Sequence, residues 1–292
     1  MQFETSTDTT RSGLASDPQG PSSLVVDWNA TVRMEVLPAD PGAQGGGIRL
    51  RTTYEKSMAS VRSDTFDPAA AETQQQYHKL EGKVVEFMLD ADGKVKSVMG
   101  LEGIVDSEKA AQSARDWIAH LSASAGAPPG GVSLGQTWSS EQPADTLPIA
   151  GLVWRTDSHY LRNESCRPVN PDVPSAPVAA ESPTNAATNS HAASDCAVIL
   201  ANLNLVRSKA SHDLTPPEFR KNGVQSAGKW TGSAQSLLYV SLATGMVVSV
   251  TQSGTEEMDV TLTSNHNTSM HYAGKIASRS QVALVADDSH GK

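Results

Sequence analysis

The sequence predicts a mainly β protein, built as a large curved antiparallel sheet of about ten strands with one substantial α-helix. Three observations predict this fold class. Apolar and polar residues alternate along many segments, as is typical of strands with one buried face. One segment alone has helical spacing. Finally, a flat sheet of ten strands would be about 45 Å wide, more than a helix about 28 Å long and about 10 Å across can cover.

Because twist accumulates over so many strands, the sheet is expected to curl on itself as a half-barrel or an open barrel. Both forms leave a concave apolar interior, whereas the two layers of a sandwich fill the space between them with side chains. The composition, rich in Val, Leu and Met but only 5% aromatic, suits a cavity for a flexible aliphatic ligand, although the same side chains can interdigitate and fill it as a packed core, the alternative that we favour.

The clearest alternation runs through Leu24–Leu37, which is predicted to be one long strand. Its apolar face is expected to hold Val26, Trp28, Ala30, Val32, Met34 and Val36. The same pattern recurs, after a Pro-Gly and Gly-rich turn at 41–47, in Ile48, Leu50, Tyr54 and Met58, then in Leu152, Trp154 and Tyr160, and again in four segments after residue 198. These segments together predict the antiparallel sheet.

Residues 107–125 form the segment with helical spacing, since Ala110, Ala114 and Trp117 recur on one side. Ser107 can cap the start of this helix, and Gly126 can end it in the left-handed conformation. The two prolines that follow prevent its continuation.

A repeated strand-turn-strand pattern predicts related halves. The segment Lys83–Val98 matches Leu237–Val250, with an aromatic residue six positions before the turn glycine in both. We therefore interpret residues 1–292 as a single β-rich domain made from two halves, about 1–125 and 131–292. Chance similarity between two hairpins is the alternative.

Two cysteines, Cys166 and Cys196, enclose residues 167–195, which are rich in Pro, Ala, Ser and Asn. This stretch cannot build a core of its own and is predicted to be a flexible or disordered loop. A disulfide at its base would stabilise the fold by roughly 3–4 kcal/mol on the chain-entropy model. The alternative is two unrelated buried thiols. A disulfide predicts an oxidising compartment, hence a periplasmic or extracellular location.

Several classes of function and site are disfavoured by the sequence. With 23 Lys and Arg against 32 Asp and Glu, a net charge of −9 and no basic stripe, nucleic acid is not an expected partner. No apolar run approaches the roughly 20 residues of a transmembrane helix. No nucleotide-binding, hydrolase or zinc-protease motif is present, so we expect no enzymatic activity, no cofactor and no metal. No signal peptide is recognisable, which indicates either a cytosolic protein or an exported one whose signal has been removed.

The following groups of ionisable residues have structural interpretations. His266 and His271 are five positions apart and would face opposite sides of a strand, so we expect loop histidines rather than metal ligands. Glu256, Glu257 and Asp259 are interpreted as the solvated face of a strand.

The hairpin regions resemble a known family. The run Leu80–Val95, the Gly135–Trp138 motif and Thr244–Val250 are similar to a bacterial family of unknown function, over residues 24 to 285. Members of that family are typically exported or lipid-anchored envelope proteins. In outline, one long sheet with one helix is also similar to the LolA-like and LppX-like carriers, half-barrels that shelter acyl chains. This chain is longer than those carriers, contains the 167–195 segment and has few aromatic residues.

The resemblance implies a non-catalytic exported envelope protein, with a lipid anchor in the full-length precursor as one form. The first hypothesis is that it binds a lipid or other apolar ligand inside the curved sheet. The alternative is a structural or protein-interaction module of the envelope with a fully packed core, and an unrecognised hydrolase is a third reading. The candidate lining residues for a ligand are Trp28, Val32, Met34, Ile48, Leu50, Tyr54 and Trp154.

Overall fold

The structure is a computed structural model that describes most of the chain. The described ranges are 2–12, 22–38, 48–64, 68–89, 95–105, 107–108, 111–112, 114–115, 128, 130–144, 147–166, 195–208, 214–243, 245, 247–266 and 268–284. The predicted loop 167–195 lies outside them, except that Asp195 begins a strand. Among the described residues, no helix combines the length and apolar character needed to span a bilayer.

Eleven strands form one antiparallel sheet, which confirms the predicted class and slightly exceeds the expected number of strands. The strands are β1 (Gln2–Ser12), β2 (Ser22–Leu37), β3 (Ile48–Ser63), β4 (Val84–Leu89), β5 (Val95–Met99), β6 (Thr137–Pro143), β7 (Leu152–Ser165), β8 (Asp195–Arg207), β9 (Val224–Ser241), β10 (Val247–Ser264) and β11 (Ser269–Ala283).

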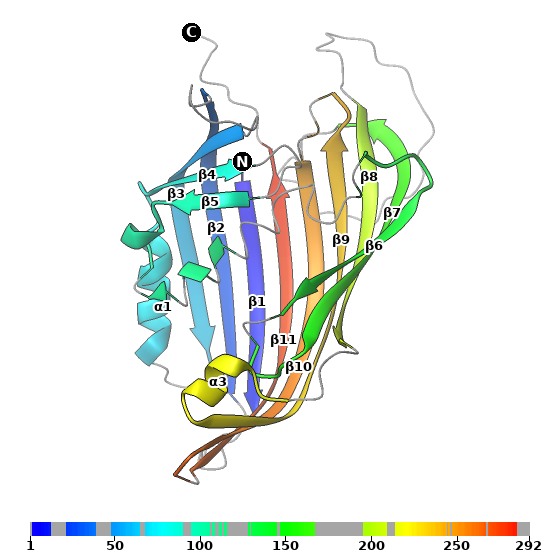
Figure 1. Ribbon diagram of the computed structural model, residues 1–292. Helices are drawn as coiled ribbons and strands as arrows, with labels where there is room; N and C mark the ends of the chain where they lie inside the picture. The colour runs from blue at the N-terminus through cyan, green and yellow to red at the C-terminus, as the bar shows by residue number, and fades with distance from the viewer. Residues whose placement is uncertain are drawn as a thin grey trace.

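The strand order is β5-β4-β3-β2-β1-β11-β10-β9-β8-β7-β6, so two meanders meet where β1 pairs with β11. The outer strands β5 and β6 do not pair with each other. The sheet is therefore an open, strongly curved half-barrel (Figure 1).

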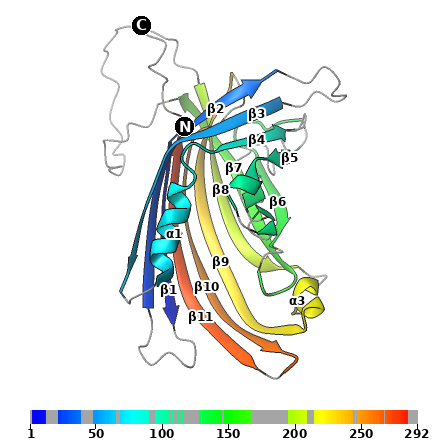
Figure 2. The ribbon, with the colours of Figure 1, turned by 90° about the vertical axis from the view of Figure 1, so that its left-hand side faces the viewer.

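The helices α1 (Pro68–His78) and the short α3 (Pro217–Lys221) lie on one side of this sheet, as Figure 2 shows. A 3-10 turn, η1 (Leu101–Gly103), precedes the segment expected to be the main helix. In that segment the described residues 108, 111–112 and 114–115 are helical, and the rest of 107–125 lies outside the described part of the chain. The alternating pattern used to predict elements did not indicate α1.

The predicted alternation in β2 is confirmed at Trp28, Ala30 and Val32, which are all buried. In β3, by contrast, the pairing register shifts, because Thr31 lies opposite Lys56 but Val32 lies opposite Tyr54. The extra residue is a β-bulge, which reverses the side on which later side chains point. Consequently Ser57 is fully buried, whereas Met58, expected on the apolar face, is 58% exposed.

The concave face of β2 and β3 carries a packed core under α1. Trp28, Ala30 and Val32 form a cluster with residues of β3 and β11, and Tyr77 of α1 packs against it. The Trp28 indole N–H donates to Ser57 Oγ at 3.0 Å, and that hydroxyl donates to the Tyr77 carbonyl at 2.7 Å. Burial raises the pKa of the Tyr77 hydroxyl. These bonds attach α1 to the sheet.

The concave face of the other half has its own core, made by the segment that joins β6 to β7. Ile149, 1% exposed, packs with Leu152, Leu205 and Val260. The backbone N–H of Ala150 donates to the Leu214 carbonyl at 2.8 Å, which joins this segment to the approach to α3. The concave face is thus covered in part of each half of the sheet, by α1 in the first half and by the segment between β6 and β7 in the second.

Cys166 and Cys196 form a disulfide at the ends of β7 and β8, as predicted, with their Cα atoms 5.0 Å apart. The two hairpins of the proposed repeat also form, as β4–β5 and β9–β10. The first lies at the edge of the sheet and the second lies in its interior. The division into related halves stays a prediction.

Candidate functional site

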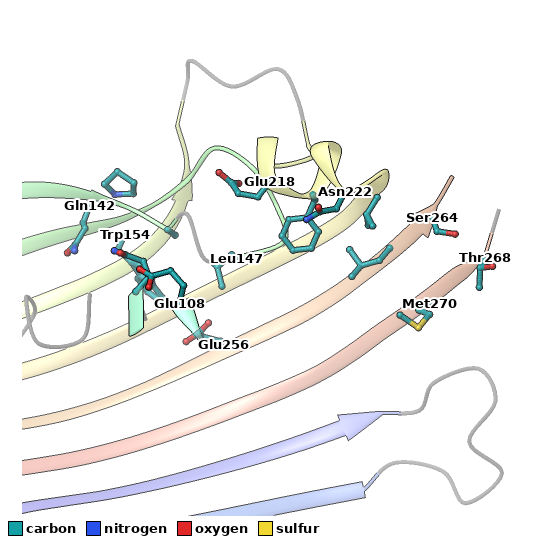
Figure 3. A pocket seen from close by; sticks show the side chains of 16 residues that line it. Glu108, Gln142, Leu147, Trp154, Glu218, Asn222, Glu256, Ser264, Thr268 and Met270 are labelled. Atoms are coloured by element: carbon teal, nitrogen blue, oxygen red, sulfur yellow. The ribbon is translucent and has the colours of Figure 1, made fainter. Parts of the chain in front are cut away.

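A groove of about 1270 Å³ opens on the concave face of the second half of the sheet. Strands β7, β9, β10 and β11 form its floor, while the end of β6, α3 and the helical residues Glu108 and Gln112 contribute its walls (Figure 3). Most of the lining is apolar. The main apolar side chains are Leu147, Trp154, Phe219, Val224, Leu262 and Met270.

Strand alternation places the floor residues. Along β10, alternate side chains from Glu256 to Ser264 point to the concave face, where Val260 is almost fully buried and Leu262 lines the groove. Register brings Met270 of β11 opposite Leu262. Side chains from the neighbouring strands β10 and β11 therefore form the floor of the groove at the Met270 end.

The wall that carries α3 is fixed by a buried polar link. Thr215, 6% exposed, accepts a hydrogen bond from the Ser226 backbone N–H at 3.1 Å, and the Ser226 hydroxyl donates to the Leu214 carbonyl at 3.2 Å. Pro217 begins the helix, where a missing N–H carries no penalty. This link fixes the position of the short helix α3, so that Phe219 lines the groove.

The other end of the groove is built on Gly232 of β9. A Cβ atom at this position would lie only 2.7 Å from Trp154 Cη2 and 3.0 Å from Glu256 Cγ. Trp154 belongs to β7, and its indole therefore extends across β8 and packs against the backbone of β9 at Gly232. The Trp230 indole N–H donates to Glu256 Oε2 at 2.8 Å, which fixes the carboxylate of Glu256 at this end of the groove.

We predict that Gly232→Ala will lower the free energy of unfolding by about 1–3 kcal/mol, because the added methyl overpacks the site under Trp154. Urea unfolding followed by circular dichroism measures this loss, and intrinsic tryptophan fluorescence reports the displaced indole. Gly232 has no left-handed backbone, so steric crowding is the only cost expected.

A double-mutant cycle supplies the control for this prediction. In a Trp154→Ala background, Gly232→Ala should cost much less, since the remaining close neighbour is the flexible Glu256 side chain. An equal cost in both backgrounds would show that Trp154 does not rest on Gly232.

Of the seven candidate lining residues, Trp154 lies in this groove. Trp28 and Val32 belong to the core under α1, and Tyr54 packs against it. Leu50 is buried, Met34 is half-buried and Ile48 is 50% exposed. The structure thus contains both alternatives raised by the sequence, a packed core under α1 and an open groove in the other half. Contact of any of the seven with a ligand stays a prediction.

The acidic group at 256–259 is divided between the two faces of the sheet. Glu257 and Asp259 are on the solvated face as expected, where Glu257 pairs with Lys275 at 3.3 Å and Asp259 with His271 at 2.7 Å. Glu256, by contrast, lines the groove. The expectation of a wholly solvated group was wrong, because adjacent strand residues must point to opposite faces.

The chain matches no protein-family model and no curated protein. Function is therefore inferred from the groove itself. Within the described residues, no group of three or more His, Cys, Asp or Glu side chains is arranged to hold a metal ion.

Proposed function

We propose that this protein is a non-catalytic exported envelope protein that binds a lipid or another apolar ligand in the groove of its half-barrel. The observation that carries the proposal is the groove, whose volume of about 1270 Å³ exceeds the roughly 300–1,000 Å³ of ordinary small-molecule sites and leaves room for a long alkyl chain. Apolar side chains such as Leu147, Leu262 and the unbranched, flexible Met270 line it, and these suit an aliphatic chain.

Two further observations support export and a carrier role. The disulfide between Cys166 and Cys196 is typical of proteins in oxidising compartments. An open half-barrel with helices on its concave side is also the outline expected from the resemblance to lipoprotein carriers. A periplasmic or extracellular location, and a lipid anchor in the precursor, are part of the proposal.

The proposal is tested with a neutral fluorescent probe and a charge placed in the groove. Wild-type protein should take up N-phenyl-1-naphthylamine with increased fluorescence, and Met270→Glu should weaken uptake about tenfold by placing a carboxylate among apolar side chains. Met270 is 47% exposed, so this change leaves folding intact. Native mass spectrometry of protein from its own host should show a bound lipid.

Ser269→Glu is the matched control, since Ser269 precedes Met270 on the opposite face of β11 and is exposed. It should leave probe uptake unchanged. Absence of uptake by the wild type, together with a lipid-free mass, would overturn ligand binding. That result would favour the interaction module, for which the tightly packed core around Trp28 and Val32 is the supporting observation.

A further inference from the structure

Glu256 is the one acidic residue on the β10 stretch that faces the groove, and it is followed on the same face by Met258, Val260 and Leu262. Its carboxylate accepts a hydrogen bond from the Trp230 indole at 2.8 Å. Its aliphatic stem contacts the same glycine as the Trp154 ring. The side chain is therefore held in place at one end of an apolar groove, rather than free on a surface.

The charge on Glu256 has no basic counterpart in the described residues. No Lys, Arg or His among them comes within 4 Å of its carboxylate, and the indole donor of Trp230 is neutral. The described residues that line the groove include Glu108 and Glu218 but no basic side chain. Glu108 is itself paired with Arg115 at 2.8 Å, which leaves Glu256 as the charge at the Trp154 end.

An aromatic ring adds to the preference for a cationic group that the Glu256 carboxylate creates. Indole faces attract cations through their quadrupole, and quaternary ammonium groups are recognised by aromatic rings next to a carboxylate. Trp154 lines the groove next to Glu256, whereas Trp230 meets the carboxylate through the N–H edge of its ring. A cationic head placed here would meet both kinds of attraction, whereas an anionic head would be repelled and would lose its hydration.

We propose that the groove selects amphiphiles with a cationic head, a quaternary ammonium or a protonated amine. The head is held at Glu256 beside Trp154, and the alkyl chain runs toward Met270 at the other end of the groove (Figure 3). Leu262, which pairs with Met270, lines that same end. This inference rests on the proposed function, because it specifies which apolar ligand the groove takes.

The test compares three amphiphiles that share a dodecyl chain and differ in the charge of the head: dodecyltrimethylammonium, dodecyl maltoside and dodecanoate. Each is used below its micelle concentration to displace N-phenyl-1-naphthylamine from the wild-type protein. The trimethylammonium compound should bind about tenfold more tightly than dodecanoate, equivalent to about 1.4 kcal/mol. Because trimethylammonium is charged at every pH, its own titration cannot produce the preference.

Glu256→Gln removes the charge and keeps an oxygen that can accept the Trp230 hydrogen bond, so it should abolish the preference for the cation while retaining binding of the neutral maltoside. Glu257→Gln is the matched control. It removes the same charge one residue away, on the opposite face, and should leave the preference unchanged.

The outcomes separate the two proposals. Equal binding of all three amphiphiles, or a preference that survives Glu256→Gln, would overturn the cationic selectivity and leave the ligand groove standing. Equal loss of the preference in Glu257→Gln would also overturn it, since the effect would then come from net charge. Failure of all three to displace the probe would overturn the groove as an alkyl-binding site.

Discussion

Replacing Trp28 by alanine is expected to lower the free energy of unfolding by about 3–5 kcal/mol, the usual cost of deleting a buried tryptophan. Trp28 is 8% exposed at the centre of the core under α1, and its ring lies 5.4 Å from that of Tyr77. Its loss leaves a cavity and also leaves the Ser57 hydroxyl without its indole donor. Equilibrium urea unfolding measures the change.

Two variants control this prediction. Trp28→Phe keeps most of the packing and loses the hydrogen bond, so it should cost about 1–3 kcal/mol. Asn29→Ala, at the exposed next position on β2, should change stability by less than about 0.5 kcal/mol. Hydrogen exchange should also show α1 opening selectively in Trp28→Ala. A cost below that of Trp28→Phe would contradict the assignment of this tryptophan to the centre of the core.

Removal of the disulfide is expected to have a similar effect. Cys166→Ala with Cys196→Ala should lower the free energy of unfolding by roughly 3–4 kcal/mol, because the chain-entropy model gives that value for a closed loop of about 30 residues. The cause is the greater freedom of the unfolded chain. The thermal midpoint of the double variant against the wild type measures this loss.

Chemical reduction is the independent check, because it opens the same bond without a substitution. Cys196 is fully buried, so alanine there also removes a little packing, and reduced wild type should fall between the oxidised protein and the double variant. Thiol labelling under denaturing conditions without reductant should detect no free cysteine. Equal stability of oxidised and reduced protein would rule out a contribution from the bond.

Strand alternation predicted the sheet well because its signal is local: each strand of an antiparallel sheet with one buried face repeats every two residues. The same signal fails at the bulge in β3. A single extra residue reverses the pattern, so that Leu50 and Ser57 face the core and Met58 does not. No feature of the sequence between these residues marks the extra residue.

The helix α1 escaped prediction for a different reason. Its sequence is rich in Ala and Gln, which favour helices, but it has little apolar periodicity. Of its described side chains, Tyr77 makes the contact with the core, and Leu80 adds to it just beyond the last turn. The described side chains of α1 therefore give little apolar pattern from which a helix could be predicted.

The groove could not be predicted because it is assembled from residues that are distant in sequence. Trp154, Phe219 and Leu262 come from three separate elements, and strand pairing together with the Thr215 link brings them into one wall and floor. Glu256 did carry a signal, since it shares parity with Met258 and Val260. Grouping it with its acidic neighbours by charge obscured that parity.

The pairing of β1 with β11 has a consequence for how the sheet is made. Each meander joins neighbours in sequence, but the seam between them pairs Gln2 with Ala283, so nearly the whole chain must be present before the central ladder can close. Contacts so distant in sequence are slow to form, because the entropy of closing the loop opposes them. Until β11 has been synthesised, the meander β1–β5 and the strands β6–β10 have no ladder between them, so the complete sheet can form only after β11 is available.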